Sequence, residues 1–407
     1  MASEWRDCTL GDFVRLQRGH DLTASEQRSG RVPVMGSAGP NGTHSEARAE
    51  GPGVVIGRSG ASIGRVHFSA VDYWPHNTCL YVTDFLGNNP RFAYYLLQTL
   101  DLAGYNSGSA QPSLNRNYIY RMKVRVPSRS KQDRIVEVLE ALDNRITLLR
   151  QTNATLESIA QALFKSWFVD FDPVRAKAEG REPDGMDAAT AALFPAEFEG
   201  SALGLIPKGW SVRSLDSFAT FLNGLALQKY PPESEEESLP VIKIAQLRAG
   251  HTNGADKASA RLKSEYVVHD GDVLFSWSGS LEVELWCGGD GALNQHLFKV
   301  TSSDVPKWFY YLATKHFLPS FREIAAHKAT TMGHIQRGHL KAAKLAMPSA
   351  ESLDKLSSPM SPLIERRVIG ALHARELAAV RDALLPRLIS GALRLPGTLE
   401  QAEETQI

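Results

Sequence analysis

The sequence predicts an α+β fold in which two similar mixed α/β heads are joined and separated by two long helices. Three observations lead to this prediction: an internal duplication, a heptad-spaced apolar series after the first copy, and a second helical stretch after the second copy. We expect the two helices to form an antiparallel coiled coil that relates the heads by a pseudo-twofold axis. The length of 407 residues suits a chain of two or three domains.

The duplication consists of five pairs of segments that occur in the same order. The first pair is WRDCTLGDFVRLQRG from Trp5 and WSVRSLDSFATFLNG from Trp210, which share Trp, Leu, Phe and Gly at matching spacings. The other pairs are VVIGRSGASIG with VLFSWSGSLEV, HNTCLYVT with NQHLFKVT, FAYYLL with WFYYLA, and SAQPSLNRNYIYRMKVRVP with ATTMGHIQRGHLKAAKLAMP. Their order predicts a first head over residues 1–128 and a second head over residues 210–349.

Apolar residues recur at alternating spacings of four and three along a stretch without Gly or Pro that follows the first copy. The series consists of Ile135, Leu139, Leu142, Ile146, Leu149, Asn153, Leu156, Ala160, Leu163 and Trp167. Only Asn153 interrupts it, and a polar residue in such a seam fixes the register of two helices. Ser130 and Asp133 have the spacing of a capping box, so a central spacer helix is predicted within 129–171. A helix buried in an ordinary core is the alternative interpretation.

The segment 172–209 is rich in Ala, Glu, Gly and Pro and is predicted to be a linker with at most one short helix. A C-terminal spacer helix is predicted over 350–392, although the sequence does not define its start. Gly370 and Pro386 weaken its pattern, and Gly391 fits its C-terminal stop. Residues 393–407 form a tail. The expected interface residues of the second helix include Leu377, Leu384 and Leu388. We expect the aromatic end of the first helix to pack against the second helix or a docked subunit, through Phe164, Trp167, Phe168 and Phe171.

Composition narrows the class of protein. The formal net charge is zero, which argues against a chain that grips phosphates without selectivity, but not against a reader of base edges. Three Cys residues far apart form no metal or disulfide pattern and suggest a reducing compartment. No apolar run is long enough for a transmembrane helix, and the charged N-terminus lacks the features of a secretory signal. We therefore expect a cytoplasmic protein that needs no membrane.

DNA is a target that suits two similar heads related by a twofold axis, since such heads read two half-sites in opposite orientations. Candidate DNA-binding residues near the end of the first copy are Gln111, Asn115, Arg116, Arg121 and Lys123. Those of the second copy are Lys328, His334, Gln336, Arg337 and Lys341. A further candidate is the loop with Arg58 and Ser59, matched by Trp277 and Ser278. Arg can hydrogen-bond guanine, and Asn or Gln can hydrogen-bond adenine. The alternative interpretation is that these residues form an ordinary solvent-exposed strand face.

The chain resembles the specificity subunit of type I restriction-modification systems over essentially its whole length. The resemblance is carried by KQDRIVEVLEALDNRITLLRQTNATLESIAQALFKSWFVDFDPVRAKAEG, by LIPKGW and by VRDALLPRLISGALRL. The family's spacer usually opens with a Glu-Gln pair after the proline, whereas this chain has Lys131 and Gln132.

This resemblance implies two target recognition domains, two spacer helices and a bipartite, asymmetric DNA target methylated on adenine N6. It also implies two modification subunits that carry S-adenosylmethionine, with two motor-nuclease subunits that can join them. ATP and magnesium would then act only on partner subunits, and no cofactor is expected on this chain.

Motifs for catalysis are absent from the sequence. It contains no Asn/Asp-Pro-Pro-aromatic motif, no Walker A, no Asp-x-Lys or Glu-x-Lys, and no HExxH, so we expect neither a catalytic residue nor a metal site. The stretch from Gly60 to Gly64 matches a nucleophile elbow around Ser62, but a second strand rather than a helix is predicted after it. An adaptor whose heads bind protein is the alternative function, mildly favoured by the acidic stretch from Glu233 to Ser238.

Overall fold

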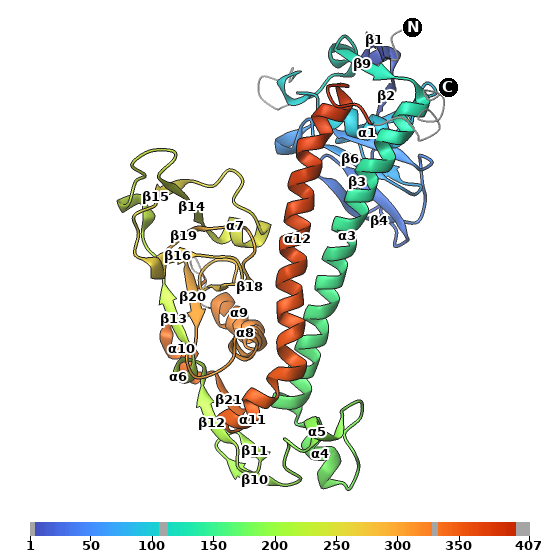
Figure 1. The fold of residues 1–407 in the computed structure, drawn as a ribbon. Coiled ribbons are helices and arrows are strands. Elements are labelled where there is room, and N and C mark those ends of the chain that lie inside the picture. The colour runs from blue at the N-terminus through green and yellow to red at the C-terminus, as the bar shows by residue number, and fades with distance from the viewer. Residues whose placement is uncertain (1–4, 106–112, 328–332, 396–407) are drawn as a thin grey trace, which may run out of the picture. The chain divides into compact units, whose positions relative to one another are not determined.

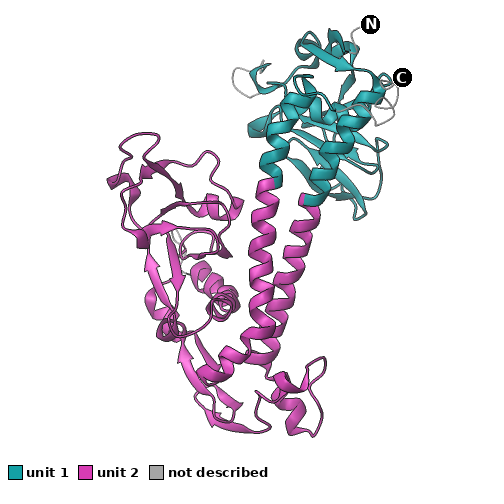
Figure 2. Ribbon diagram, in the orientation of Figure 1, with its two compact units in different colours: residues 1–145, 377–407 teal, residues 146–376 magenta. Residues whose placement is uncertain are grey.

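The computed structural model describes residues 5–105, 113–327 and 333–395, which form two compact units (Figures 1 and 2). Unit 1 comprises Met1–Arg145 and Leu377–Ile407, and unit 2 comprises Ile146–Glu376. Each unit contains one of the predicted heads and a part of each long helix. The α+β fold class is therefore confirmed.

The first head is built mainly on antiparallel strands, with helix α1 (Pro90–Gln98) packed against β5 (Gly53–Gly57) and β6 (Val66–Ser69). Its four-stranded sheet has the order β2 (Arg15–Arg18), β8 (Cys79–Asp84), β5 (Gly53–Gly57), β6 (Val66–Ser69). The smaller sheets are β4 (Gly39–His44), β3 (Val32–Gly36), β7 (Trp74–Pro75), and the pair β1 (Trp5–Thr9), β9 (Lys123–Pro127). The helical segments are η1 (Leu10–Asp12), η2 (Gly60–Ser62), α1 (Pro90–Gln98), η3 (Ala103–Tyr105) and α2 (Arg116–Ile119).

Helix α1 begins where its sequence supplies both a cap and a favourable first residue. The Asn89 side chain accepts hydrogen bonds from the backbone N–H groups of Arg91 and Phe92, and Pro90 occupies the first turn, where its missing N–H is not needed. Phe92 and Tyr95 lie on the buried face of α1. Through this face, the helix packs in one hydrophobic core with residues of the four-stranded sheet.

The second head repeats the four-stranded antiparallel sheet and the terminal strand pair of the first, and its remaining sheet has one strand more. Its sheets are β13 (Thr220–Asn223), β20 (Leu297–Thr301), β17 (Val273–Ser276), β18 (Val283–Leu285); then β15 (Lys257–Ser259), β14 (Ser238–Ile242), β19 (Gly291–Leu293), β16 (Val267–Val268); and the pair β12 (Ser211–Ser214), β21 (Lys344–Met347). The helical segments are α6 (Leu215–Phe218), η5 (Leu227–Lys229), α7 (Ile244–Ala249), η6 (Ser264–Tyr266), α8 (Lys307–His316), α9 (Leu318–His327) and α10 (Arg337–Ala342). The repeated sequence segments form equivalent strands in the same order, which confirms the predicted duplication.

Two long helices pack against each other within both units. Helix α3 (Arg129–Lys165) continues into a π-helical turn, η4 (Ser166–Asp170), and helix α12 (Ser357–Ile389) follows the short α11 (Ala350–Lys355). In unit 1 the end of α12, at Leu388, shares a core with the start of α3, at Leu139. In unit 2 the start of α12, at Met360, shares a core with the end of α3, at Phe164. The pairing is therefore antiparallel in each unit, as the sequence predicts.

The predicted seam residues all face the interior. Ile135, Leu139, Ile146, Ala160, Phe164, Trp167 and Leu388 are buried, and Leu142, Leu149, Asn153, Leu156, Leu163, Leu377 and Leu384 are half-buried. The two interruptions of the apolar patterns face each other, since a Cβ at Gly370 of α12 would collide with the Asn153 side chain of α3. Gly370 thus provides the space that the polar Asn153 needs.

The ends of the long helices differ in detail from the prediction. Because α3 begins at Arg129, Ser130 lies inside its first turn, and Asp133 instead accepts hydrogen bonds from Asn89 Nδ2 at 2.6 Å and Arg129 Nε at 2.9 Å. Helix α12 begins at Ser357 and continues through Pro386. Gly391, with φ +76°, takes the left-handed conformation that ends such a helix, as predicted.

The segment 172–209 is more ordered than predicted. It contains α4 (Asp172–Ala178), α5 (Ala188–Ala191) and the hairpin of β10 (Phe198–Ser201) and β11 (Gly204–Pro207). Its apolar residues Val174 and Phe194 are buried in the core of unit 2, with Phe194 5.7 Å from the Trp167 ring. A composition rich in small and charged residues conceals these few anchors.

Candidate nucleic-acid interface

The first head carries a polar hollow of about 620 Å³ where β2 and β5 end and α2 begins. It is lined by Gln17, Arg18, Gly19, His20, Asp21, Arg58, Leu80, Ser113, Leu114, Asn115 and Arg116. Three residues predicted from distant parts of the sequence, Arg58, Asn115 and Arg116, therefore meet in one place.

The loop after β5 is held by backbone and hydroxyl hydrogen bonds. Ser59 forms an isolated antiparallel bridge with Ser113, and the Leu114 N–H donates to the Arg58 carbonyl at 2.8 Å. Ser37 Oγ donates to the Ser59 carbonyl at 2.8 Å. Arg58 Nη1 donates to the Asn77 carbonyl at 3.3 Å. These contacts hold the Arg58 guanidinium at the wall of the hollow.

Asn115 and Arg116 come from the start of α2 and are both exposed. Asn115 Oδ1 caps this helix by accepting from the Asn117 N–H at 3.0 Å, and its amide N–H₂ group supplies two further donors. Arg116 Nη1 donates to the Leu16 carbonyl of β2 at 2.9 Å. One guanidinium edge is thus anchored, which orients the remaining donors.

The sequence interpretation missed Gln17, Arg18, His20 and Asp21, which line the same hollow. Arg18 Nη2 donates to Asp21 Oδ1 at 3.0 Å, and Asn77 Nδ2 also donates to this carboxylate. The hydrogen bond from Asn77, followed by the charge of Arg18, lowers the pKa of Asp21. The repeated glycines Gly19 and Gly224 were the sequence signal that could have pointed to this region. A Cβ at either position would collide with the backbone of His76 or Asn294, so each glycine marks a place where two backbone segments approach closely.

A second hollow of about 560 Å³ shares His20 and Asp21 with the first. Arg28, His44, Glu46, Arg48 and Trp74 are among its lining residues, and the Arg48 guanidinium lies 5.1 Å from the Trp74 ring centre. The polar face of the first head therefore presents donors and acceptors of both charges rather than a uniformly basic surface.

The second head places Trp277 and Ser278 in the same position after β17. Ser278 bridges to His334, as Ser59 does to Ser113, and its hydroxyl lies 3.0 Å from His296 Nδ1. Trp277 Nε1 donates to Asn223 Oδ1 at 2.9 Å. Both side chains are thereby held by their own head.

The arginines at the ends of the two copies make the same contact. Arg337 Nη2 donates to the Phe221 carbonyl of β13 at 3.3 Å, which matches the bond from Arg116 to β2. Gln336 and Lys341 are exposed on either side of Arg337. Each head thus presents one arginine that is held by an equivalent hydrogen bond.

Other positions in this frame carry different side chains. In the order first head and second head they are Arg18 and Asn223, Arg58 and Trp277, Thr78 and His296, Ser113 and His334, and Asn115 and Gln336. The two heads therefore have the same backbone arrangement at these positions but differ in the hydrogen-bonding groups that they present.

Two of the predicted residues lie elsewhere in the first head. Lys123 begins β9 and Arg121 lies in the turn before it; both are exposed, and neither lines either hollow. Gln111 and Lys328 fall outside the described residues. The assignment of Arg121 and Lys123 to DNA contact stays a prediction.

A comparison with known families decides what this frame is. Residues 2–158 and 207–367 match the family described as type I restriction modification DNA specificity domain. The chain belongs to this family. Each matched segment spans one head and extends into the long helix that follows it.

Relatives of this family cover most of the chain. The Type I restriction enzyme HindI specificity subunit of Haemophilus influenzae is 24% identical over 355 residues, which cover 75% of this chain and 77% of that protein. The Type I restriction enzyme MjaIX specificity subunit of Methanocaldococcus jannaschii is 26% identical over 318 residues, covering 75% and 69%. The crystal structure of a Type-I restriction-modification system S subunit from M. genitalium shares the fold, with a TM-score of 0.54, 12% identity and coverage of 96% and 97%.

The chain is accordingly a specificity subunit, and its role is recognition of a DNA target rather than catalysis. The turn around Ser62 agrees with this role, because β6 returns antiparallel to β5 after it and no helix follows as a nucleophile elbow requires. Within the described ranges, no helix has the length and apolar character that crossing a membrane needs.

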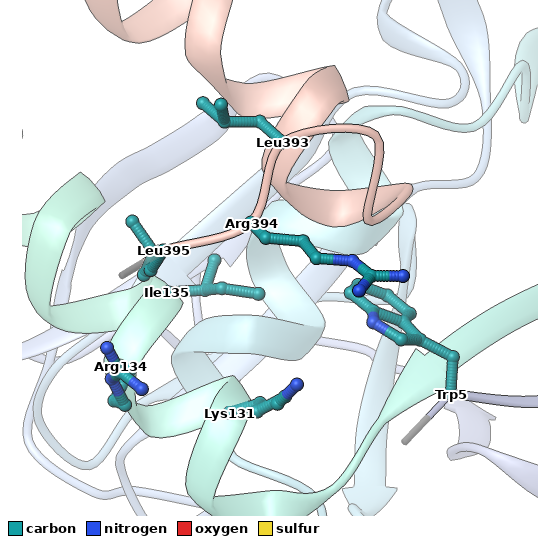
Figure 3. A pocket seen from close by; sticks show the side chains of 7 residues that line it. All are labelled: Trp5, Lys131, Arg134, Ile135, Leu393, Arg394 and Leu395. Carbon is teal, nitrogen blue, oxygen red and sulfur yellow. The ribbon is translucent and has the colours of Figure 1, made fainter. Parts of the chain in front are cut away.

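In this specificity subunit, the residues that follow the C-terminal spacer helix pack beside the start of α3. After Gly391 the chain brings Leu393, Arg394 and Leu395 beside Ile135 of α3 and Trp5 of β1, where they line a small pocket (Figure 3). Lys131 and Arg134 line the same pocket. Both spacer helices are in this way tied to β1 of the first head.

Proposed function

We propose that the two heads read two different half-sites of one bipartite DNA target, and that α3 and α12 set the gap between them. The observation that carries this proposal is the repeated frame with exchanged side chains, in which equivalent loops and equivalent arginines present unequal hydrogen-bonding groups. Equal frames suit the repeating geometry of a duplex, and unequal side chains suit an asymmetric sequence.

The chemistry of the first hollow favours a half-site that contains a G·C pair. Arg58 and Arg116 supply donors that match the O6 and N7 acceptors of guanine. Asp21 is an acceptor, since a carboxylate can accept from the N4 amino group of cytosine, and its lowered pKa favours the ionised form. The second head offers Gln336, whose amide suits adenine.

We propose further that the subunit acts in the cytoplasm and assembles with two modification subunits, which carry S-adenosylmethionine and methylate adenine N6. Two motor-nuclease subunits, with ATP and magnesium, can join this complex, and this chain binds no cofactor itself. The support is that both curated relatives are named as subunits of restriction enzymes. The residues that line the hollows are suited to recognising a DNA target. We therefore assign methylation and cleavage to the partner subunits.

The experiment is to sequence methylated adenines in cells with and without this chain. We expect a bipartite, asymmetric motif that disappears when the chain is removed. Replacing residues 1–128 with the first head of another specificity subunit should change one half of the motif and leave the other half and the gap unchanged. A protein-binding adaptor would leave the motif unaltered, and that result would overturn the proposal.

A further inference from the structure

Each head contacts α3 through an equivalent buried tyrosine. Tyr95 of α1 and Tyr311 of α8 are the second members of the repeated Tyr-Tyr pairs. Tyr95 Oη donates to Asp143 Oδ2 of α3 at 2.6 Å. Tyr311 Oη donates to the carboxylate of Glu157 of α3, at 2.7 Å to Oε1. Both bonds lie inside a single unit, so each belongs to the fold of its own head and spacer segment.

The same two carboxylates also bind arginines of α12. Arg381 Nη1 lies 2.8 Å from Asp143 Oδ1, and Arg367 Nε lies 2.7 Å from Glu157 Oε2. Asp143 and Glu157 are separated by two heptads, as are Arg367 and Arg381. Each carboxylate thus links three elements, and both links recur at one heptad position. We name them the first joint (Tyr95, Asp143, Arg381) and the second joint (Tyr311, Glu157, Arg367).

The second joint reaches further into its head. Lys315 of α8 lies 2.9 Å from Glu157, and Arg367 Nη2 lies 2.8 Å from Glu284 of β18. The side chains of Glu157, Arg367 and Lys315 are only 13%, 15% and 17% exposed. Two acids and two cations therefore balance in a partly buried cluster that connects the sheet, α8 and both long helices.

At neutral pH, Glu157 is ionised and the Tyr311 hydroxyl is protonated, which are the states that their hydrogen bond requires. Burial by itself raises the pKa of Glu157, but Arg367 and Lys315 outweigh burial and hold this pKa below its ordinary value. Burial raises the pKa of Tyr311 well above its ordinary value, so the hydroxyl keeps its proton. The bonds are therefore directional and charge-assisted at neutral pH.

Directional bonds constrain rotation in a way that apolar packing does not. A tyrosine hydroxyl bonded to a carboxylate that an arginine also holds has one favourable orientation, and rotating the helix would leave these buried polar groups without their partners. Each tyrosine also belongs to the hydrophobic core of its head, Tyr95 together with Phe92 and Tyr311 together with Phe309.

We propose that Asp143 and Glu157 are positioning residues that fix the orientation of each head on the spacer helices and thereby the gap that the subunit selects. This inference rests on the proposed function, in which the heads read half-sites. It assigns the gap to two side-chain joints as well as to helix length.

The test uses the complete complex with its modification subunits and a set of duplexes in which the two mapped half-sites are joined by gaps that differ by single base pairs. Asp143→Asn and Glu157→Gln keep size but remove the charge that holds the arginine. We expect the preference of each variant for the native gap over its neighbours to fall about tenfold, with the half-site letters unchanged. Asp143→Glu should restore more of the preference than Asp143→Asn.

Two further variants keep the test decisive. Tyr311→Phe removes one hydroxyl and leaves the ion pairs, so it should fold and still loosen the choice of gap. Glu137→Gln and Glu365→Gln, at exposed positions of α3 and α12, are matched controls that should keep the native preference. Joint variants that lose thermal stability but keep the native gap preference would show a purely structural role and overturn the inference. A wild-type complex without any bipartite preference would instead overturn the proposed function.

Discussion

Arg116 and Arg337 are held by equivalent hydrogen bonds in heads whose other reading positions differ. In both, the guanidinium donates to a carbonyl of the first strand in the four-stranded sheet, Leu16 or Phe221. An arginine fixed at one edge loses less rotational freedom on binding, which favours its use in base or phosphate recognition.

Arg116→Ala should therefore weaken recognition of the first half-site and leave the second unchanged, and Arg337→Ala should do the reverse. A loss of about 1–3 kcal/mol is expected for each if the arginine reads a base. Binding to duplexes with one half-site randomised measures it. Arg121→Ala serves for comparison, since loss of a phosphate contact at that exposed residue would lower affinity for all sequences alike.

Glu157 gives the second head a pH-dependent contribution to stability. Its pKa in the folded protein is held below the ordinary value, mainly through Arg367 and Lys315 acting against burial. A carboxylate with a lowered folded pKa stabilises the protein above its unfolded pKa, about 4.3, and this contribution is lost as pH falls through the folded pKa.

The difference in free energy of unfolding between the wild type and Glu157→Gln should thus shrink as pH is lowered from about 6 towards 3. Denaturant titrations at several pH values measure this difference. A difference in free energy of unfolding that stays constant over this pH range would contradict the role of Glu157. Glu365→Gln, at an exposed position of α12, provides the reference.

At the scale of elements, the aromatic end of α3 belongs to the core of the second head. The sequence predicted packing against the second helix or a docked subunit. Phe164 and Phe168 lie 5.6 and 5.1 Å from Phe309 of α8, and Phe168 lies 5.7 Å from Trp210. Helix α12 joins this core through Met360, so the prediction was correct for α12 but missed the head.

Trp167→Ala should accordingly lower the stability of unit 2 by about 3–5 kcal/mol, because a large buried ring leaves a cavity. Thermal or denaturant unfolding of the isolated subunit measures this loss. Ile159→Ala, at a side chain that is 43% exposed on the same helix, should change stability by less than about 0.5 kcal/mol. Full stability with impaired assembly would point back to a docking role for Trp167.

The end of α12 depends on Gly391. Its φ of +76° is unfavourable for residues with a Cβ, and a Cβ there would lie 2.8 Å from Trp5 Cε2. Gly391→Ala should destabilise unit 1 by about 1–3 kcal/mol. Gly338→Ala, where a Cβ meets nothing within 4 Å, is the control, and equal effects of the two variants on the unfolding midpoint would refute the argument.

For the whole molecule, the spacer helices have a common register that permits a controlled change of length. Asp143 faces Arg381 and Glu157 faces Arg367, so positions on α3 and α12 advance in opposite directions by equal steps. Seven residues inserted after Leu149 of α3 and seven after Ala374 of α12 preserve this register and add about 10 Å of helix.

We expect the doubly lengthened subunit to select a gap longer by about three base pairs, at about 3.4 Å each, or to lose binding, with both half-sites unchanged. Mapping of methylated adenines measures the gap. Insertion into α3 alone breaks the register and should abolish selection. An unaltered gap in the doubly lengthened subunit would show that α3 and α12 do not act as a spacer.

The sequence by itself determined the duplicated order of segments, the two long helices and the family, because these depend on patterns that repeat at fixed spacings along the chain. Only the tertiary structure showed that Arg18 and Asp21 share a hollow with Arg58 and Arg116, that Gly370 makes room for Asn153, and that Asp143 and Glu157 join the heads to both helices. Such contacts join residues far apart in sequence. They follow from strand register and side-chain direction, which local periodicity does not encode.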